Sequence, residues 1–399
     1  MKKIVLAYSG GLDTSYCIHH FAKEKGMEVH AIIANNGAFN SEDIDTFRSR
    51  AFSLGAHVFE EIDITQEYYQ HCIRYLIFGN IKRGDVYPLS VSSERMFQAL
   101  AIARYAGKIK ADAVSHGSTG AGNDQVRFDL VFKICLPEIE IITPIRDQKL
   151  SREFEIEYLK RNGIAWNSER SVYSINQGIW GTSIGGKETL TSHLPLPDNA
   201  YPHTLQATEP SSLSIEFEQG EPIRLNGELF KNPIDLIQQL NKIGYNYSIG
   251  RDIHVGDTII GIKGRVAFEA PAALMINAAH ALIEKHVLTK HQIYWKKQLA
   301  DWYGMMLHEG SYLEPTMRWI ETLLTESQKN VNGEVFLTLH PYRFTLDGIQ
   351  SDFDLMKSGG GVYGEKNTGW TAEEAKGFIQ LLSVPLKSYY SLHTEELPI

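Results

Sequence analysis

The chain has 399 residues, 43% of them hydrophobic, with 39 basic and 48 acidic side chains and a net charge of −9. The length suits about two domains, and the acidic balance argues against the basic surface on which nucleic-acid binding depends. No run approaches the ~18 consecutive apolar residues of a membrane span. Because the N-terminus begins directly with a predicted strand, we expect no signal or transit peptide and a cytoplasmic protein.

The three cysteines are far apart and odd in number, and they form no Cys-x-x-Cys pair: Cys17, Cys72 and Cys135. This spacing argues against a disulfide framework and against a structural zinc site. We expect the cysteines to act as small buried hydrophobic residues.

Residues 1–165 alternate predicted strands and helices. The strands are short apolar runs, expected at Lys3–Ser9, Glu28–Asn35, His57–Ile64, Ala111–His116 and Ile139–Pro144. Ser41, Thr65 and Ser151 are placed to cap helices that end at glycines 55, 79 and 163. Repeated strand–helix units predict a parallel, doubly wound α/β nucleotide-binding domain.

Residues 166–360 predict a second domain of α+β character. Residues 167–210 are rich in Ser, Gly, Pro and Asn, and we expect a long irregular but ordered functional loop. Hairpins are expected at 212–227 and 333–348, and helices at Pro233–Ile243, Pro271–Val287, Lys290–Trp302 and Pro315–Ser327. Residues 361–399 predict a C-terminal arm with a helix, Thr371–Leu382, and an extended end that packs either on another subunit or on its own domain.

Two glycine-rich stretches match nucleotide-binding motifs in letters but not in context. Gly359–Gly364 fits G-x-G-x-x-G, yet no strand precedes it and no helix follows promptly. Gly181–Lys187 nearly fits the Walker A motif, but Glu188 stands where a magnesium-binding Ser or Thr is required. We expect neither stretch to bind a nucleotide.

The stretch "SGGLDTS", residues 9–15, has the right context for a phosphate loop. It follows the first strand and opens a helix, so backbone N–H groups converge at the positive end of that helix. Open α/β sheets bind ligands at this edge. Asp13 is unusual beside phosphate, unless it caps the helix or helps to hold Mg²⁺. The alternative is a capped strand–helix turn without a ligand.

Two further polar clusters follow along the chain. His116–Phe128, "HGSTGAGNDQVRF", comes directly after a predicted strand and offers donors for a carboxylate, with Asp124 for an ammonium group. The alternative is a polar turn with a surface Arg–Asp pair. In Tyr87–Met96, "YPLSVSSERM", Ser92 or Ser93 can cap a helix, and Arg95 can meet an anion near its first turn.

These segments together resemble one family. "SGGLDTS" matches the pyrophosphate loop of the N-type ATP pyrophosphatases, which split ATP between the α and β phosphates. "AYSGGLDTS", "YPLSVSSER", "HGSTGAGNDQVRF", "YSINQGIWGTS", "GIKGRVAFEAP" and the tail "GWTAEEAKGFIQLLSVPLK" follow the order and approximate spacing of argininosuccinate synthases. The resemblance spans nearly the whole chain.

The resemblance implies an activity and a set of ligand positions. Members join citrulline to aspartate with ATP through a citrullyl-adenylate, releasing AMP and pyrophosphate, with Mg²⁺ at the phosphates. The implied ATP positions are Ala7, Tyr8, Ser9, Gly10, Gly11, Leu12, Asp13, Thr14, Ser15, Ala34 and Gly117. Aspartate would contact Thr119, Asn123 and Asp124. Citrulline would contact Tyr87, Ser92, Asn123, Arg127, Ser174, Ser183, Gly256 and Phe268. No residue is assigned as a dedicated metal ligand.

Several positions depart from the family pattern, mostly on the citrulline side. The usual "GTSLAR" is here "SVSSER", so Val91 replaces a threonine, and Ala121 replaces a lysine. Asn176, Gly178, Thr182 and Gly185 replace Asp, Asn, Arg and Glu in the segment close to "YSxDxNLWGRSxE". Gly256 falls where a citrulline-binding glutamate is expected, and Phe268 where a tyrosine is expected. Asp257 would replace the glutamate if the loop shifted by one residue.

Four hypotheses about function follow. The first is a divergent argininosuccinate synthase, and the second is a related ligase that joins aspartate to a different adenylated acceptor. A tRNA-modifying enzyme would need a basic face or a catalytic cysteine pair, and the sequence shows neither. A nucleotide sensor without turnover would not need the second domain. The resemblance also implies a homotetramer in which the C-terminal arm reaches across subunits.

Overall fold

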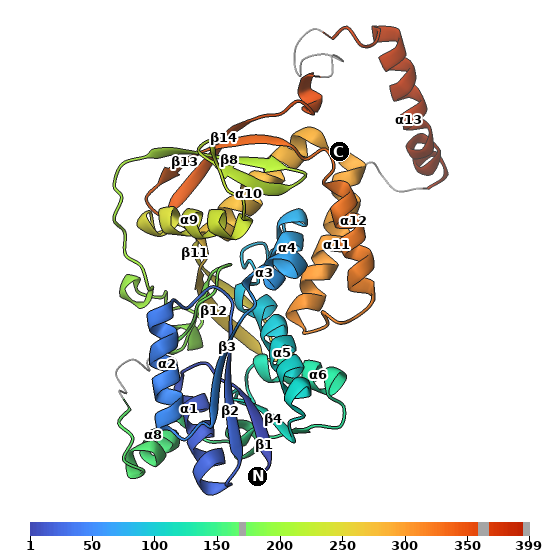
Figure 1. The fold of residues 1–399 in the computed structure, drawn as a ribbon. Helices are drawn as coiled ribbons and strands as arrows, with labels where there is room; N and C mark the ends of the chain where they lie inside the picture. Colours follow the sequence, from blue (N-terminus) through green and yellow to red (C-terminus); the bar gives the residue numbers. More distant parts are fainter. Residues whose placement is uncertain (167–172, 358–366, 394–399) are drawn as a thin grey trace. The chain divides into compact units, whose positions relative to one another are not determined.

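A computed structural model describes residues 1–166, 173–357 and 367–393. The chain forms two compact units, Met1–Ser351 and Asp352–Ile399. The ribbon of the chain is drawn in Figure 1. The stretch Gly359–Gly364, which matches G-x-G-x-x-G, lies outside the described residues.

The first sheet is fully parallel, as the sequence predicts. Its strands are β1 (Lys3–Ala7), β2 (Glu28–Asn35), β3 (Val58–Asp63), β4 (Ala113–His116) and β5 (Glu140–Ile141). Their order in space is β3-β2-β1-β4-β5. The order reverses between β1 and β4, and such a switch point is where open α/β sheets bind ligands.

Helices cover both faces of this sheet. The helices of residues 1–165 are α1 (Leu12–His19), α2 (Ser41–Ser53), α3 (Thr65–Tyr68), α4 (Arg74–Phe78), α5 (Ser90–Ile109), α6 (Asp124–Cys135), α7 (Pro144–Asp147) and α8 (Arg152–Arg161). Figure 1 shows α5 and α6 on one side of the sheet and α1, α2 and α8 on the other. Along β1, Val5 joins the hydrophobic cluster that includes α5, whereas Ile4 and Leu6 join the cluster with α1. This alternation explains the continuous apolar run of the strand.

The predicted caps are only partly correct. Ser151 caps α8 by accepting from the Phe154 N–H at 3.3 Å, but α2 is capped by Asn40 and not by Ser41. Thr65 does not cap its helix, because the carboxylate of Asp63 accepts from the Thr65 N–H at 2.8 Å. That helix reaches Phe78 through a π-helical turn, Tyr69–Ile73, between α3 and α4. A second π-helical turn, His20–Glu24, extends α1.

The predicted caps at Ser92 and Ser93 are wrong. α5 begins at Ser90, and Leu89 precedes it in a left-handed conformation without a side-chain cap. The hydroxyl of Ser92 instead donates to the Leu89 carbonyl at 3.3 Å, and that of Ser93 to the Ser90 carbonyl at 3.1 Å. Both serines are therefore buried inside the first turn.

The second sheet is antiparallel and packs on long helices, as predicted. It contains β8 (Ser211–Glu218), β9 (Glu221–Leu225), β10 (Glu228–Leu229), β13 (Gly333–His340) and β14 (Arg343–Gln350), in the order β10-β9-β8-β13-β14. The helices are α9 (Pro233–Asn246), α10 (Pro271–Val287), α11 (Lys290–His308) and α12 (Thr316–Ser327). Short 3₁₀ turns occupy Lys187–Leu190 and Asp198–Ala200.

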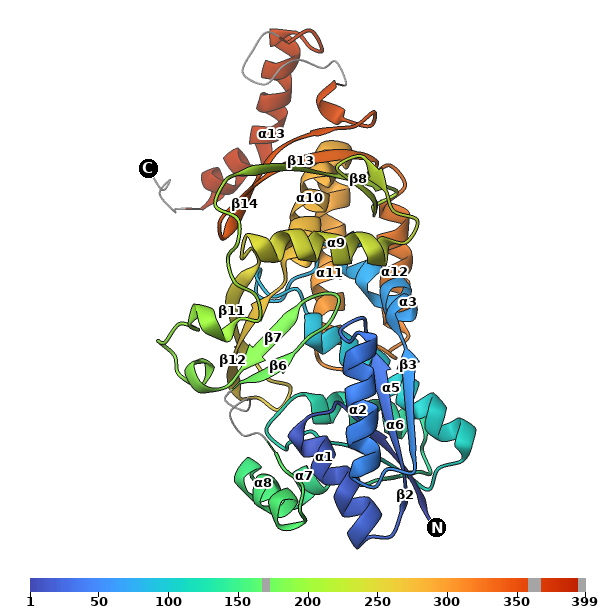
Figure 2. The same cartoon turned by 60° about the vertical axis from the view of Figure 1, so that its left-hand side comes forward.

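A third sheet shows that the expected irregular segment, 167–210, is partly structured. Its strands are β6 (Ser174–Asn176), β7 (Thr182–Gly185), β11 (Arg251–Asp257) and β12 (Lys263–Glu269), in the antiparallel order β11-β12-β7-β6. Residues 167–172 lie outside the described part. Figure 2 shows this sheet between the parallel sheet and α9.

The second unit contains a 3₁₀ turn, Leu355–Lys357, and α13 (Ala372–Leu392). Thr371 caps α13 in a capping box with Glu374. The helix continues past the expected end at Leu382 and through Pro385, so the predicted extended end is wrong up to Leu392. Across the described residues of both units, none of the helices has the length and apolar character needed to span a membrane.

Candidate functional site

The loop after β1 has the geometry of an anion site. Gly10 turns the chain at φ +72°, and a Cβ atom there would lie 2.5 Å from the ring of Phe47, so only glycine fits. The Ser9 and Thr14 hydroxyls lie 3.2 Å apart, and Arg50 donates to the Gly10 carbonyl at 2.6 Å. No side chain within the described ranges caps α1 at Gly11, so N–H groups of its first turn can meet an anion.

The expected ATP positions come together at the switch point. Ala7 pairs with His116 across β1 and β4, and a Cβ atom on Gly117 would lie 2.8 Å from the Thr14 methyl group. Ala34 lies near the end of the neighbouring strand β2. Tyr8, Leu12 and Ser15 are buried under the loop and support it from below. The loops after β1 and β4 therefore form one continuous edge.

A carboxyl pair lies beside this edge. Burial and the neighbouring Asp13 carboxylate raise the pKa of Glu155, on α8, to about 9. Glu155 is therefore protonated at neutral pH. No cluster of three or more potential metal-ligating side chains occurs within residues 1–166, 173–357 and 367–393. Mg²⁺ at phosphates commonly uses only one or two carboxylates, so Asp13 fits such a role.

The second loop carries a half-buried aspartate that is paired with two buried arginines, where a surface pair was the alternative. Asp124, at the start of α6, accepts from Arg95 Nε at 2.9 Å and from Arg127 Nη1 at 2.8 Å. Burial favours a higher pKa for Asp124, but the two guanidinium groups outweigh it and hold the pKa below its usual value. Asp124 is therefore ionised and already paired with two arginines. Arg95, which was expected to meet an anion, bonds the carboxyl groups of Asp124 and Glu94 instead.

Arg127 and Asn123 fix this loop to distant elements. Arg127 donates to the His308 carbonyl at the end of α11 from Nε at 3.0 Å and from Nη2 at 2.7 Å. Asn123 Oδ1 accepts from the Ile259 N–H, in the loop between β11 and β12, at 2.8 Å. Thr119 lies in the turn before α6, partly exposed. Asn123 and Arg127 are both among the positions expected to contact citrulline. Both also join residues 1–165 to elements of the second region.

Glu94 is a buried acidic residue beside the candidate site that the sequence analysis missed. It stands where the family pattern has alanine, is 1% exposed, accepts from Arg95 Nη1 at 2.7 Å and from the Asn36 amide. Burial raises its pKa to about 8; Arg95 opposes the shift, and Asp124 adds to it. Arg95 Nη2 also donates to Asn176 Oδ1 at 2.7 Å.

Gly178 makes room for Glu94. A Cβ atom on Gly178 would lie 2.3 Å from Glu94 Oε2 and 2.7 Å from the Asn36 amide nitrogen. The family pattern has alanine and asparagine at positions 94 and 178, whereas this chain has glutamate and glycine. The sequence therefore contained a signal, because positions 94 and 178 both depart from the family pattern. It did not show that these two positions are in contact.

Part of the expected citrulline set forms one cluster. The Tyr87 hydroxyl lies 3.2 Å from Ser183 Oγ and accepts from the Val91 N–H at 3.1 Å. The Tyr87 and Phe268 rings are 5.4 Å apart, and Phe268 pairs with Ser183 across β12 and β7. Phe268 is fully buried in the hydrophobic core, so it supports this cluster from behind.

The remaining positions of that set take no part in these contacts. Ser92 is buried in α5, and Ser174 lies exposed on β6, opposite Gly185. Gly256 lies on β11 opposite Gly264. The carboxylate of Asp257 bonds Lys263 at 2.6 Å and is largely exposed, and neighbouring residues of a strand face opposite sides. Asp257 is therefore not in the position of a substitute for the expected glutamate.

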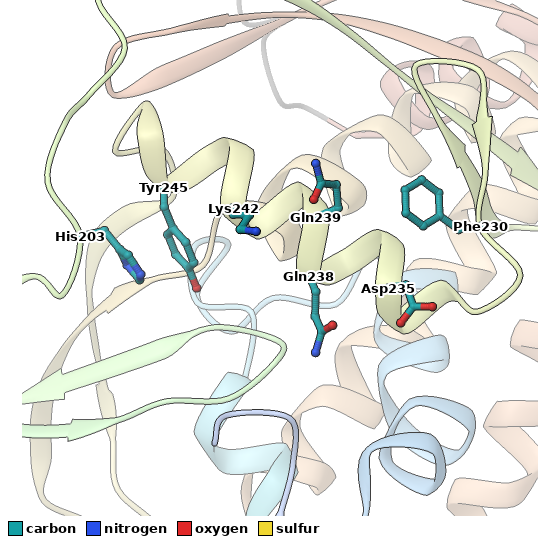
Figure 3. A pocket seen from close by; sticks show the side chains of 7 residues that line it. All are labelled: His203, Phe230, Asp235, Gln238, Gln239, Lys242 and Tyr245. Carbon is teal, nitrogen blue, oxygen red and sulfur yellow. The ribbon is translucent and has the colours of Figure 1, made fainter. Parts of the chain in front are cut away.

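A cavity of about 560 Å³ lies beside α9, away from these clusters. Figure 3 shows its lining side chains, including Gln238, Lys242 and Tyr245 of α9 and His203. The His203 ring stacks on Tyr245 at 3.6 Å, and His203 Nδ1 bonds Glu269 at 2.7 Å. None of its lining residues belongs to the expected ligand positions.

The Glu155 carboxyl predicts a pH-dependent stability. Unfolded Glu155 ionises near 4.5 and the folded group near 9, so unfolding releases a proton at the pH values between, and stability falls as pH rises. We expect Glu155→Gln to remove up to about 1.4 kcal/mol per pH unit of this slope. Urea unfolding of the ligand-free protein at about pH 7.0 and 8.5 measures this slope. Both pH values lie above the range in which ordinary histidines titrate. Glu157→Gln, on the exposed side of α8, is the control; parallel slopes for wild type and Glu155→Gln would contradict the prediction.

The contact between positions 94 and 178 predicts a coupled pair of substitutions. Gly178→Asn alone overpacks the Glu94 carboxylate, so we expect a loss of about 1–3 kcal/mol in unfolding free energy. Adding Glu94→Ala vacates the space, so the double variant should be more stable than the sum of the single effects by about 1 kcal/mol or more. Gly185→Ala is the control, because a Cβ atom there meets nothing within 4 Å. Additive effects would show that the two positions do not interact.

Comparisons with known proteins match the whole chain to one family. Residues 3–165 match the model of the arginosuccinate synthase N-terminal HUP domain, and residues 173–389 match the arginosuccinate synthase C-terminal domain. The argininosuccinate synthase of Dictyoglomus thermophilum is 36% identical over 385 residues, covering 96% of both chains. That of Pyrococcus furiosus is 34% identical over 396 residues, covering 98% of this chain and 95% of the relative. With both family models and relatives of this identity over almost its full length, the chain belongs to the argininosuccinate synthase family.

Proposed function

We propose that this chain joins citrulline to aspartate with ATP, forming argininosuccinate and releasing AMP and pyrophosphate. The observation that carries this proposal is the continuous edge formed by Gly10 and Gly117 at the switch point, in a chain whose family membership covers both domains. Family membership supports citrulline over the different acceptor that the sequence left open. We propose the cytoplasm as its location, consistent with three free cysteines.

The chemistry requires little beyond positioning. The ureido oxygen of citrulline attacks the α-phosphate and pyrophosphate leaves; the aspartate amine then displaces AMP. Backbone N–H groups at the start of α1 stabilise charge on the departing pyrophosphate, and the fixed loops hold the reacting groups in line. Mg²⁺ held with Asp13 would neutralise part of that charge.

Covalent catalysis by cysteine does not fit the site. Cys17, on α1, is fully buried, and burial raises the pKa of its thiol well above the usual value. Burial also raises the pKa of Cys72. A thiol held protonated is a poor nucleophile, so adenylation of the acceptor itself is the mechanism that the chain supports.

The proposed activity requires both citrulline and aspartate in addition to ATP. We expect steady formation of AMP and pyrophosphate only when all three substrates are present. Citrulline labelled with ¹⁸O in the ureido group should transfer the label to AMP, because that oxygen bonds the α-phosphate. Pyrophosphate release with aspartate and another acceptor, but never with citrulline, would contradict the proposal.

We also propose a homotetramer that uses the C-terminal arm, 361–399. α13 carries apolar side chains that the described residues of its own unit leave exposed, among them Phe378, Leu381 and Leu382 at 65%, 73% and 64%. Exposed apolar faces of this kind mark association surfaces.

Size-exclusion chromatography with light scattering tests the arm. The full chain should elute as four chains of 45.0 kDa each, and a chain lacking residues 365–399 as a smaller species. Leu382→Glu should weaken assembly, whereas Lys376→Glu on the same helix should not. A tetramer that survives the truncation would show that assembly uses other surfaces.

A further inference from the structure

Position 256 is sterically linked to His254. Both residues lie on β11, two apart, so their side chains face the same side of the strand. A Cβ atom on Gly256 would lie 2.6 Å from His254 Nε2 and 3.2 Å from Cε1. The imidazole therefore fills the space in which the family pattern places a citrulline-binding glutamate.

The His254 ring belongs to the acceptor cluster. It stacks on Tyr87, with ring centroids 5.6 Å apart and planes inclined at 17°, and Tyr87 in turn contacts Ser183 and Phe268. His254 is 7% exposed, and its Nε2 is buried without a hydrogen-bond partner among the described residues. A buried polar atom without a partner costs free energy that a ligand can recover.

The surroundings of His254 carry positive charge. Burial lowers the pKa of His254, and Arg83 lowers it further. The same Arg83 lowers the pKa of His308, after burial and Arg127, so both imidazoles are neutral at pH 7. The Asp257 carboxylate is paired with Lys263 at 2.6 Å, and Arg83 Nη2 donates to the Asp257 backbone carbonyl at 3.3 Å. Arg83 therefore supplies a positive charge near His254 that the paired Asp257 carboxylate does not take up.

We propose that His254 and Arg83 bind the acceptor through its carboxylate, and that this chain does not require the acceptor's α-amino group to be free. The inference rests on the proposed function and specifies its substrate class as a ureido acid with an α-carboxylate. Replacing a carboxylate side chain by an imidazole N–H donor reverses the polarity of the contact. A neighbouring cation then favours an anion and disfavours an ammonium group.

Three acceptors separate the two ends of the substrate. Pyrophosphate release by the full-length enzyme, at saturating ATP and aspartate, is measured with citrulline, with citrulline acetylated on the α-nitrogen, and with citrulline whose α-carboxylate is an amide. We expect kcat/KM for the acetylated acceptor to stay within about 10-fold of citrulline, and that for the amide to fall about 100-fold, the range of a charge-assisted contact.

Variants test the residue itself. His254→Ala should raise the KM for citrulline about 10-fold or more, leave the KM values for ATP and aspartate unchanged, and reduce the penalty of the amide. His254→Gln, which keeps an N–H donor, should recover part of the loss. His30→Gln is the control, because His30 is an equally buried imidazole that bonds Tyr105 and Glu28. Thermal unfolding confirms that each variant is folded.

The double variant His254→Ala/Gly256→Glu tests the reversal of polarity. It restores both the carboxylate and the space for it, so we expect the acetylated acceptor to become at least about 100-fold worse than citrulline. Wild-type enzyme that uses citrulline but loses the acetylated acceptor about 100-fold would overturn this inference alone. Wild-type enzyme that never uses citrulline would overturn the proposed function and this inference with it.

Discussion

The doubly paired carboxylate of Asp124 is the interaction on which the site depends. It joins Arg95 of α5 to Arg127 of α6, and each guanidinium then reaches another element, β6 through Asn176 and the end of α11 through the His308 carbonyl. The two guanidinium groups are buried, and buried charges are tolerated only when each is paired and hydrogen-bonded. Loss of one member leaves the others unsolvated, so the network fixes the relative positions of the parallel sheet, the third sheet and α11.

The departures from the family pattern obey the same packing constraint. Glu94 enlarges its position and Gly178 shrinks the facing one; His254 fills the space that Gly256 leaves. Interiors are packed closely enough that a larger side chain needs a smaller neighbour. At the proposed ATP positions, Gly10 and Gly117 lie so close to Phe47 and Thr14 that a larger residue would not fit without a change in its neighbour. The departures accordingly gather at the proposed acceptor positions.

The sequence predicted those features that are determined by residues close together in the chain, and missed those that depend on distant residues. β1, β2 and the turn into α1 are specified by adjacent residues, and the prediction of these elements is confirmed. The third sheet pairs β7 with β12, more than 80 residues later in the chain, and no periodicity in either segment reveals this. Caps were misplaced by one or two residues at Asn40 and Asp63, because several neighbouring side chains can accept the same N–H groups. Glu94 stood inside a quoted motif, but its burial depends on Asn36 and Gly178 from other segments.

The buried carboxyl groups of Glu155 and Glu94 affect the charge of the site. Glu155 and Glu94 both have raised pKa values, about 9 and about 8, because burial disfavours their ionised forms. A protonated Glu155 adds no negative charge beside the phosphate loop. Glu94 accepts from Arg95 and from the Asn36 amide, and these donors oppose the effect of burial on its pKa. Burial thus reduces the negative charge that the two carboxyl groups carry at neutral pH, and this reduces the repulsion that a polyphosphate or an amino-acid carboxylate would meet there.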